Sequence, residues 1–336
     1  MVFVNYARIA IGPIVLLGDI KMKDKFGRTI TYLRLSVTDL CNLRCKYCMP
    51  AEGICKKAHE DILSEDEMVM AVEAAATLGI KKIRITGGEP LVKKNILSIC
   101  ERVGKISGVD EVCVTTNGVL LKEYAQGLFD AGVSHLNISL DTLDAKKFKE
   151  ITRVGDLEKV LAGIDEAIKV GFRKIKLNAV LMRGFNDDEI RNLAELTMDR
   201  PIDMRFIELM PMVDTQIDKS AYMPVREVLE VLPELEELDV DGVAKLYKLP
   251  GAKGKIGLIS PVSDNFCAGC NRIRLTADGK FKPCLHAPEE FSIKGLDFDG
   301  MLEQTKKAVL AKPEKHGDLT GENISKASRS MNAIGG

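Results

Sequence analysis

The 336-residue sequence contains no tryptophan, only four histidines and few aromatic residues of any kind, at 5%. It also carries almost no net charge, because 48 basic residues oppose 49 acidic ones and leave a formal charge of −1. A balanced chain of this kind gives no reason to expect nucleic acid as a partner, so any affinity for anions has to come from local clusters.

Long hydrophobic runs are missing as well. The best candidate, residues 9–20, is shorter than the roughly 20 apolar residues that a membrane-spanning helix needs, and it contains Gly12 and Pro13. It does not predict a signal peptide either, because no small-residue cleavage site follows a basic start. We therefore expect no membrane partner, and we interpret residues 1–22 as an N-terminal extension or an artefact of the assigned start site.

The nine cysteines do not predict a disulfide framework, because their number is odd and six of them fall into two tight groups. The other three are Cys55, Cys100 and Cys113. Cys100 and Cys113 lie in apolar segments, and we expect them to be small buried side chains. Free thiols are typical of a reducing compartment, so the sequence predicts a cytoplasmic protein.

The first cysteine group is Cys41, Cys45 and Cys48, with the spacing C-x3-C-x2-C. Iron–sulfur clusters normally take four cysteines, so three thiolates on one loop can leave the fourth iron of a cluster open to a ligand. Zinc is the alternative, since closely spaced cysteines also bind zinc. The apolar alternation at 33–37 favours the cluster, because it predicts a barrel strand that delivers the loop.

The second group is Cys267, Cys270 and Cys284. It predicts either another three-cysteine cluster or, with His286 as a fourth ligand, a zinc site. Arg272 lies between the last two cysteines together with Arg274, and strand alternation places both guanidinium groups on one face. Arginine forks match phosphate oxygens, so the pair suggests a polyphosphate ligand, although a solvated basic strand is the simpler alternative.

Strand-like and helix-like segments alternate from about residue 30 to 210. Strands are predicted at 33–38, 81–86, 111–116, 134–140, 173–181 and 203–209. Helices are predicted at 65–78, 94–106, 120–132, 157–170 and 187–199, the first with a capping box at Ser64 and Glu67.

Such alternation implies an α/β protein with parallel strands, and six units are too few for a closed eight-stranded barrel. We therefore predict an open partial β/α barrel over 23–214 and a C-terminal cluster-binding region over 215–336. In barrels of this kind the chemistry lies at the carboxyl ends of the strands, where the first cysteine loop and the Gly-Gly-Glu-Pro segment at 87–90 are expected.

These motifs together resemble the GTP 3′,8-cyclases, a family of radical S-adenosylmethionine (SAM) enzymes that begins molybdenum cofactor biosynthesis. The resemblance covers about 23–336 and includes the C-terminal Gly335-Gly336. It implies a SAM-binding 4Fe–4S cluster at Cys41, Cys45 and Cys48, and a second, GTP-binding 4Fe–4S cluster at Cys267, Cys270 and Cys284.

The resemblance also implies contacts to both small molecules. The SAM site is expected at Tyr47, Gly87, Gly88, Glu89, Ser139 and Met210. GTP contacts are expected at Arg34, Lys82, Arg84, Thr115, Lys176, Arg205, Arg272, Ile273 and Arg274. Beyond the clusters, the active-site candidates are Arg272, Arg274, Gly335 and Gly336.

Seven of the implied GTP contacts are cations, and five of these lie in predicted strands. Buried cations are costly unless a ligand or a counter-charge neutralises them, and a triphosphate would do so. The alternative is internal salt bridging to Glu89, Asp141 or Glu208.

The implied reaction begins with reductive cleavage of SAM. A 5′-deoxyadenosyl radical then removes hydrogen from C3′ of GTP, and C3′ bonds to C8 to give (8S)-3′,8-cyclo-7,8-dihydroguanosine 5′-triphosphate. An electron donor, hand-off to cyclic pyranopterin monophosphate synthase and a homodimer are further expectations. The competing hypotheses are a peptide-modifying radical SAM enzyme with two clusters, and a non-enzymatic electron carrier or zinc-stabilised module.

Overall fold

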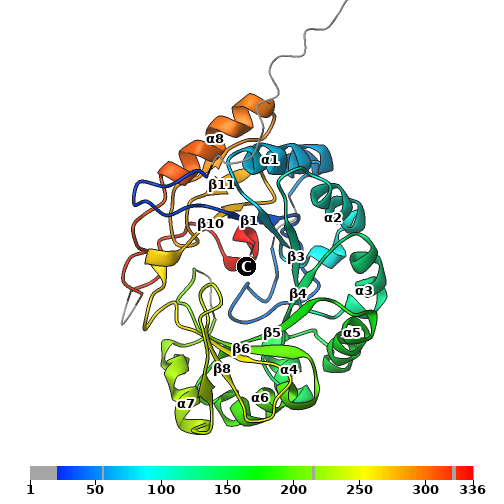
Figure 1. Ribbon diagram of the computed structural model, residues 1–336, viewed down its shortest axis with the longest axis vertical. Coiled ribbons are helices and arrows are strands. Elements are labelled where there is room, and N and C mark those ends of the chain that lie inside the picture. The colour runs from blue at the N-terminus through cyan, green and yellow to red at the C-terminus, as the bar shows by residue number, and fades with distance from the viewer. Residues whose placement is uncertain (1–20, 55–56, 214–215, 320–322, 336) are drawn as a thin grey trace, which may run out of the picture.

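A twisted sheet organises the chain in the computed structural model, which describes residues 21–54, 57–213, 216–319 and 323–335. Within these ranges the sheet has twelve strands in the order β12-β11-β10-β1-β2-β3-β4-β5-β6-β9-β8-β7 (Figure 1). The expectations for residues 1–20 and Gly336, and the ungrouped cysteine Cys55, lie outside the described residues.

The strand–helix alternation predicted from the sequence is present. The strands are β1 (Tyr32–Ser36), β2 (Lys82–Thr86), β3 (Glu111–Thr116), β4 (His135–Ser139), β5 (Lys174–Leu181) and β6 (Ile202–Glu208). The predicted helices are α1 (Glu65–Thr77), α2 (Ile96–Gly104), α3 (Leu121–Asp130), α5 (Leu157–Val170) and α6 (Ile190–Asp199). One helix that the sequence analysis missed, α4 (Ala145–Thr152), lies between β4 and α5, and only Phe148 and Ile151 give it an apolar face.

The C-terminal region extends the parallel sheet at both edges. β9 (Ile256–Ile259) pairs parallel to β6, and β10 (Arg272–Leu275) pairs parallel to β1. Antiparallel strands continue from them: β11 (Lys280–Lys282), β12 (Phe291–Ser292), β8 (Lys245–Lys248) and β7 (Glu236–Glu237). Because the sheet ends at β12 and β7 without closing, the predicted open partial barrel is confirmed.

Three further helices follow the barrel units: α7 (Val228–Val231), α8 (Phe298–Leu310) and α9 (Met331–Ile334). α8 packs beside α1 on the outside, whereas α9 lies within the curve of the sheet (Figure 1). No helix in the described part of the chain is both long and apolar enough to cross a membrane.

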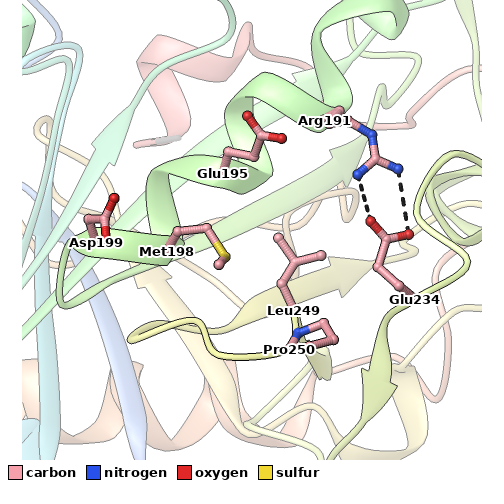
Figure 2. A pocket seen from close by; sticks show the side chains of 7 residues that line it. All are labelled: Arg191, Glu195, Met198, Asp199, Glu234, Leu249 and Pro250. Carbon is pink, nitrogen blue, oxygen red and sulfur yellow. Dashed lines mark hydrogen bonds and ion pairs between the residues drawn. The ribbon is translucent and has the colours of Figure 1, made fainter.

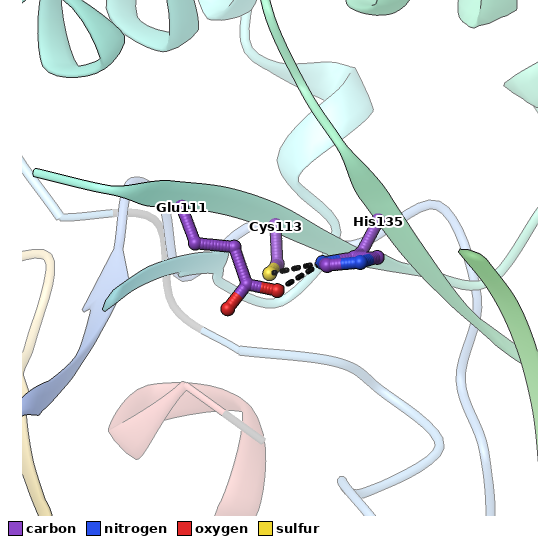
Figure 3. Close-up of side chains that lie close together, drawn as sticks. All are labelled: Glu111, Cys113 and His135. Carbon is purple, nitrogen blue, oxygen red and sulfur yellow. Dashed lines mark hydrogen bonds and ion pairs between the residues drawn. The ribbon is translucent and has the colours of Figure 1, made fainter. Parts of the chain in front are cut away.

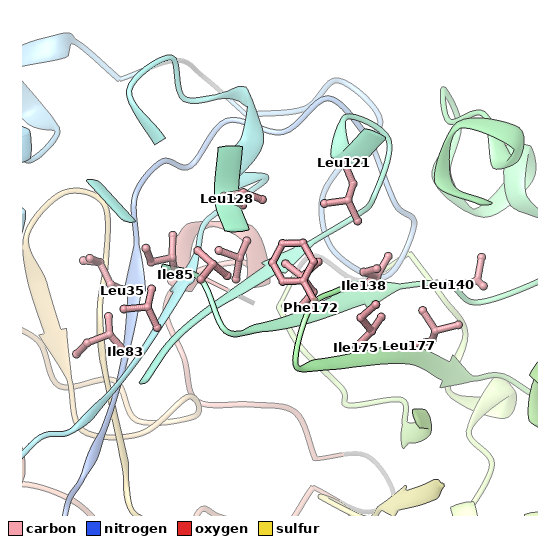
Figure 4. Packing of buried hydrophobic residues seen from close by; sticks show 14 of the residues in the cluster. Leu35, Ile83, Ile85, Leu121, Leu128, Ile138, Leu140, Phe172, Ile175 and Leu177 are labelled. Carbon is pink, nitrogen blue, oxygen red and sulfur yellow. The ribbon is translucent and has the colours of Figure 1, made fainter. Parts of the chain in front are cut away.

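The main core lies between the sheet and the outer helices. Alternate strand residues such as Leu35, Ile85 and Ile138 are fully buried and face the helical layer, which contributes Leu121 and Leu128 (Figure 4). Cys100 is also fully buried in this core, and Cys113 is buried on β3, as predicted. Since the apolar residues occupy the outer face, the intervening residues of each strand are left for the concave face.

Candidate active site

The concave face carries layers of charged side chains. Residues paired across parallel strands share a face, and Arg34 pairs with both Arg84 and Arg274. Arg205 on β6 pairs with Asn178 on β5, which lies two residues beyond Lys176. The structure therefore gathers predicted GTP-binding cations from separate strands on the concave face of the sheet. We call the space that this face encloses the lumen.

Many polar atoms of this lumen are buried without a hydrogen-bond partner in the described part of the chain. They are Arg34 Nε, Arg84 Nη1, Thr115 Oγ1, Asn137 Oδ1, Asn178 Oδ1, Arg205 Nε and Arg272 Nη2. Leaving such a group unsatisfied costs about 1–3 kcal/mol, so the lumen is suited to a ligand rich in polar atoms.

Two members of that set, Asn137 and Asn178, were missed by the sequence analysis. Asn137 lies two residues before Ser139, and Asn178 lies two residues after Lys176. Strict alternation along the predicted strands could therefore have placed both in the lumen. Ile273 shows the converse: it alternates with Arg272 and Arg274 and is fully buried in the outer core, so only its backbone can line the lumen.

Two carboxylates partly compensate the lumen cations. Lys82 contacts Glu111 at 2.6 Å, while Lys176 and Arg205 both contact Oδ2 of Asp241, at 2.7 and 2.8 Å. The partners are therefore not the ones suggested by the sequence. Burial opposes ionisation of Asp241, but the hydrogen bond from Lys176 and the charges of Lys176 and Arg205 hold its pKa below the usual range.

The three carboxylates proposed as salt-bridge partners instead accept hydrogen bonds from uncharged groups. Asp141 accepts from Tyr47 Oη at 2.7 Å and from the Val180 backbone at 2.9 Å. Glu208 accepts from the backbone of residues 225, 262 and 263. Internal salt bridging through Glu89, Asp141 and Glu208 is thus wrong for the described residues.

The first cysteine loop follows the carboxyl end of β1, as expected. The Cys48 backbone N–H donates to the Cys45 carbonyl at 2.9 Å, which forms a turn within the motif. Burial raises the pKa of Cys41 to about 11 and that of Cys48 to about 12. Such thiols become ligands when a metal centre replaces their protons.

The spacing of the sulfur atoms bears on the choice between zinc and an iron–sulfur cluster. Four-coordinate zinc with Zn–S bonds of about 2.3 Å places its sulfur ligands about 3.8 Å apart. Among the described residues, neither cysteine group has all its sulfurs within 4.8 Å of one another. Neither three-cysteine group is therefore arranged as a preformed mononuclear zinc site.

Gly87 and Gly88 are required by the close approach of the backbone that leads into the cysteine loop. A Cβ on Gly88 would lie 2.4 Å from the Leu40 carbonyl oxygen, and one on Gly87 would lie 2.5 Å from that of Thr38. The glycines thus fix the position of the loop against β2, a reason that the sequence did not reveal.

Glu89 is fully buried beside this contact. Its oxygens accept from the Leu91 backbone, from Thr116 Oγ1 at 2.7 Å and from the Asn117 backbone at 2.6 Å. Burial raises its pKa to about 7 despite these hydrogen bonds. A carboxylate has about four acceptor positions, so one remains for a cationic ligand group.

The remaining predicted SAM contacts lie around the same end of the barrel. Tyr47 is within the cysteine loop, Ser139 ends β4, and Met210 follows β6. Met210 packs in a cluster with Met212 and Ile334. These predicted contacts are therefore gathered where parallel strands end, which is the usual location of barrel active sites.

The second cysteine group lies beside the edge strand β10. Cys267 begins a 3-10 turn (Cys267–Gly269), while Cys284 follows β11. Burial would raise the pKa of Cys270, but the charges of Lys312 and Arg272 outweigh it and bring the pKa to about 7. A thiol of this kind is readily deprotonated for metal binding.

The histidine that hydrogen-bonds a cysteine of this group is not the one that the sequence suggested. His316 hydrogen-bonds Cys267, and this bond raises the pKa of His316 although burial opposes it. His286, the predicted alternative ligand, is 2.9 Å from Ser325 Oγ, and its ring centroid lies 4.9 Å from that of the tilted His316 ring. His316 is far from the cysteines in sequence, so spacing could not have identified it.

The C-terminal segment enters the lumen. Arg274 Nη1 donates to the Gly335 carbonyl at 2.7 Å, and Asn332 donates to the Asp39 carbonyl at 3.4 Å. Gly335 has φ +86°, and a Cβ there would lie 2.7 Å from Thr86 Oγ1. Glycine is therefore needed at this position for both conformation and space.

A hollow of ≈590 Å³ on α6 lies apart from this constellation (Figure 2). The ion pair between Arg191 and Glu234 borders it, and Met198 and Leu249 contribute apolar walls. None of the predicted site residues lines it, so it does not alter the assignment of the site.

Comparisons with solved structures and family profiles agree with this architecture. Residues 35–197 match the profile of the Radical SAM superfamily, and residues 202–317 match that of Molybdenum Cofactor Synthesis C. SuiB of Streptococcus suis superposes with a TM-score of 0.61 at 17% identity, over 78% of this chain and 62% of that one. The anSMEcpe structure with bound AdoMet gives 0.57 at 14% identity, over 85% and 78%. The fold and the cysteine loop define a radical SAM protein.

Sequence relatives identify the family within the radical SAM proteins to which the chain belongs. The GTP 3′,8-cyclase of Alkaliphilus oremlandii is 48% identical over 323 residues, covering 94% of this chain and all of that protein. Those of Peptoclostridium acidaminophilum and Moorella thermoacetica are 49% and 44% identical, over 93% and 94% of this chain and 98% and 100% of theirs. The chain belongs to the GTP 3′,8-cyclase family.

Proposed function

We propose that the chain is a lyase-type radical SAM cyclase that converts GTP to (8S)-3′,8-cyclo-7,8-dihydroguanosine 5′-triphosphate. This is the first step of molybdenum cofactor biosynthesis. The observation that carries the proposal is the layer formed by the half-buried Arg34 and the buried Arg84 and Arg274, whose charges are incompletely compensated. A tetra-anionic nucleotide would neutralise these charges.

The cysteines Cys41, Cys45 and Cys48 would hold the SAM-binding 4Fe–4S cluster. When bound, that cluster and SAM supply the hydrogen-atom abstraction that starts the cyclisation. The protein's own residues orient the two molecules: Glu89 has one acceptor position left for the SAM ammonium, and Gly88 keeps the loop against β2. Tyr47, Gly87, Ser139 and Met210 complete this site.

The substrate would occupy the lumen between the strands. Arg34, Lys82, Arg84, Lys176 and Arg205 would bind the triphosphate, with Thr115 and the backbone of Ile273 beside it. Cys267, Cys270 and Cys284 would hold a second 4Fe–4S cluster that contacts the guanine base, flanked by Arg272 and Arg274. Gly335 and Gly336 would close the lumen and exclude water from the reacting atoms.

Further parts of the proposal concern organisation and partners. We assign 23–214 to the radical SAM barrel and 215–336 to the region that carries the second cluster. The protein would work in the cytoplasm, since free thiols and iron clusters suit a reducing compartment, and it would form a homodimer. It would take electrons from a separate donor and pass its product to cyclic pyranopterin monophosphate synthase.

Anaerobic turnover with dithionite, SAM and GTP tests the proposal. We expect a chromatographically distinct isomer of GTP with unchanged mass, because the hydrogen atom removed from the ribose is replaced by an electron and a proton. SAM cleavage that proceeds equally with and without GTP, and yields no isomer, would contradict GTP as the substrate.

A further inference from the structure

Three potential metal ligands converge on the concave face outside both cysteine groups. Glu111 and Cys113 project from β3, and His135 projects from the adjacent strand β4 (Figure 3). Cys113 and His135 are directly paired across the two strands. One ligand atom from each of the three residues lies within 4.8 Å of the other two, which no other such group in the described ranges does.

The contacts favour a metal site over a proton relay. Both the Cys113 sulfur, at 3.6 Å, and a Glu111 carboxylate oxygen contact the same ring nitrogen, Nδ1 of His135. A relay needs the thiol on one ring nitrogen and the carboxylate on the other. Here the sulfur, the carboxylate oxygen and the ring nitrogen lie within 4.8 Å of one another, a spacing at which one ion could bind all three.

The donor types and the sulfur–nitrogen separation suit zinc, and the Glu111 oxygen, which contacts Nδ1 directly, would move outward to bind the ion. Tetrahedral zinc with Zn–S of about 2.3 Å and Zn–N of about 2.0–2.1 Å separates sulfur from nitrogen by about 3.6 Å. The observed separation of Cys113 Sγ from His135 Nδ1 is 3.6 Å. A set with one sulfur, one nitrogen and one oxygen is typical of zinc and leaves its fourth position open.

The charges around the group are compatible with an ion. Glu111 presents Oε1 to His135 while Oε2 accepts from Lys82 at 2.6 Å, so the lysine holds the carboxylate from outside the ligand set. Metal binding would release the thiol proton of Cys113, and the resulting thiolate together with the Glu111 carboxylate would balance the two positive charges of zinc. Burial raises the pKa of the Cys113 thiol, and the charge of the nearby Arg84 opposes this rise only in part.

We propose that Glu111, Cys113 and His135 bind a zinc ion at the amino-terminal end of the lumen. Glu111 and His135 are the first residues of their strands, whereas the first cysteine loop follows the carboxyl end of β1. The ion is therefore distinct from both cysteine clusters. It links β3 to β4 and fixes Lys82 through Glu111, with a water or a ligand oxygen in the fourth position.

The test uses the holoenzyme with its iron loaded. Zinc is added at one equivalent, loosely bound metal is removed by a chelator, and zinc and iron are counted by mass spectrometry. Zinc K-edge X-ray absorption then reports its ligands without interference from iron. We expect about one zinc per chain, with one sulfur at about 2.3 Å and three nitrogen or oxygen neighbours.

Variants separate this site from the others. Cys113→Ala and His135→Gln should each weaken zinc retention by at least about 10- to 100-fold, the loss caused by removing even a group that only orients a ligand, without lowering the iron content. Cys100→Ala is the matched control, since Cys100 is an equally buried free cysteine in α2, and it should retain zinc. Absence of retained zinc, or zinc with three sulfur neighbours, would overturn the proposal even if a variant fails to fold, because both are measured on the unaltered chain.

Discussion

The surroundings of Lys176 in the lumen lower the pKa of its side chain. Burial and the neighbouring charge of Arg205 lower the pKa of Lys176 to about 7, although Asp241 opposes this shift. A lysine in this state is half deprotonated near neutral pH in the free protein. Because a phosphate binds the ammonium form, ligand affinity should be full below this pKa and decline as the pH rises above it.

This equilibrium predicts that GTP binding weakens between pH 7 and 9 in the absence of SAM. Arginine remains charged throughout this range, so Lys176→Arg should show a much flatter profile. Lys176→Gln should bind GTP roughly 10- to 100-fold more weakly at pH 7, which is the effect of losing a charged hydrogen bond. Equilibrium dialysis would check both, with the exposed Lys169→Gln as control. Equal pH dependence in Lys176→Arg and the parent would contradict this role.

A single methyl group should displace the first cluster. In Gly88→Ala the new Cβ would meet the carbonyl oxygens of Leu40 and Asp39 at about 2.4–2.5 Å, and backbone atoms cannot move aside as a flexible side chain can. We expect this variant to lose roughly half of its iron. Gly269→Ala is the control, since Gly269 lies beside Cys270 and its added methyl group would have no neighbouring atom within 4 Å. Unchanged iron in Gly88→Ala would rule out the close approach.

Individual residues differ in how well the sequence revealed them. Cys41, Cys45 and Cys48 are identified by their spacing, and Arg34 and Arg84 by their place in strands. Asp241 could not be found, because it reaches Lys176 and Arg205 from a hairpin far along the chain. Such long-range pairings leave no local periodic signal.

Among the elements, the helices and strands of the barrel follow local signals closely. α1 begins where predicted because Ser64 Oγ accepts from the Glu67 backbone while the Glu67 carboxylate accepts from the Ser64 backbone. The strands β9 and β10 were not predicted as partners of β6 and β1, since their pairing depends on distant segments. α4 was not predicted because its apolar face has too few residues to produce a periodic pattern.

The capping box gives a quantitative expectation for α1. Ser64→Ala removes the side-chain acceptor at the start of the helix and should lower the free energy of unfolding by about 1 kcal/mol. Urea unfolding followed by circular dichroism would measure it. Ser107→Ala, at an exposed turn position, should change stability by much less. Equal effects of the two substitutions would show that the cap is not formed.

For the whole molecule, the C-terminal region completes the barrel as well as carrying the second cysteine group. β9 and β10 cover the edges of β6 and β1, which would otherwise expose unpaired backbone groups. α9 then lies within the curve of the sheet, where Arg274 donates to the Gly335 carbonyl (Figure 1). The sequence predicted an open barrel, but it did not reveal that residues beyond 250 supply two of its parallel strands.

Two truncated chains separate the role of β9 and β10 in covering the sheet edges from the role of α9 in the lumen. A chain that ends at residue 213 should aggregate, because both edges of the parallel sheet are exposed. A chain that ends at residue 330 should fold and keep its iron but lose turnover, since α9 and Gly335 are removed from the lumen. Light scattering, iron analysis and turnover would check both. A monomeric 213-residue form with a cooperative thermal transition would contradict the structural role of β9 and β10.

The central claim is that SAM and GTP meet in this lumen with the ribose placed for hydrogen abstraction. The most direct measurement supplies the anaerobically reconstituted protein with dithionite, SAM and GTP deuterated at C3′, and determines the mass of the 5′-deoxyadenosine formed. The account predicts deuterium in that product. Unlabelled 5′-deoxyadenosine, formed at a rate that GTP does not change, would contradict it.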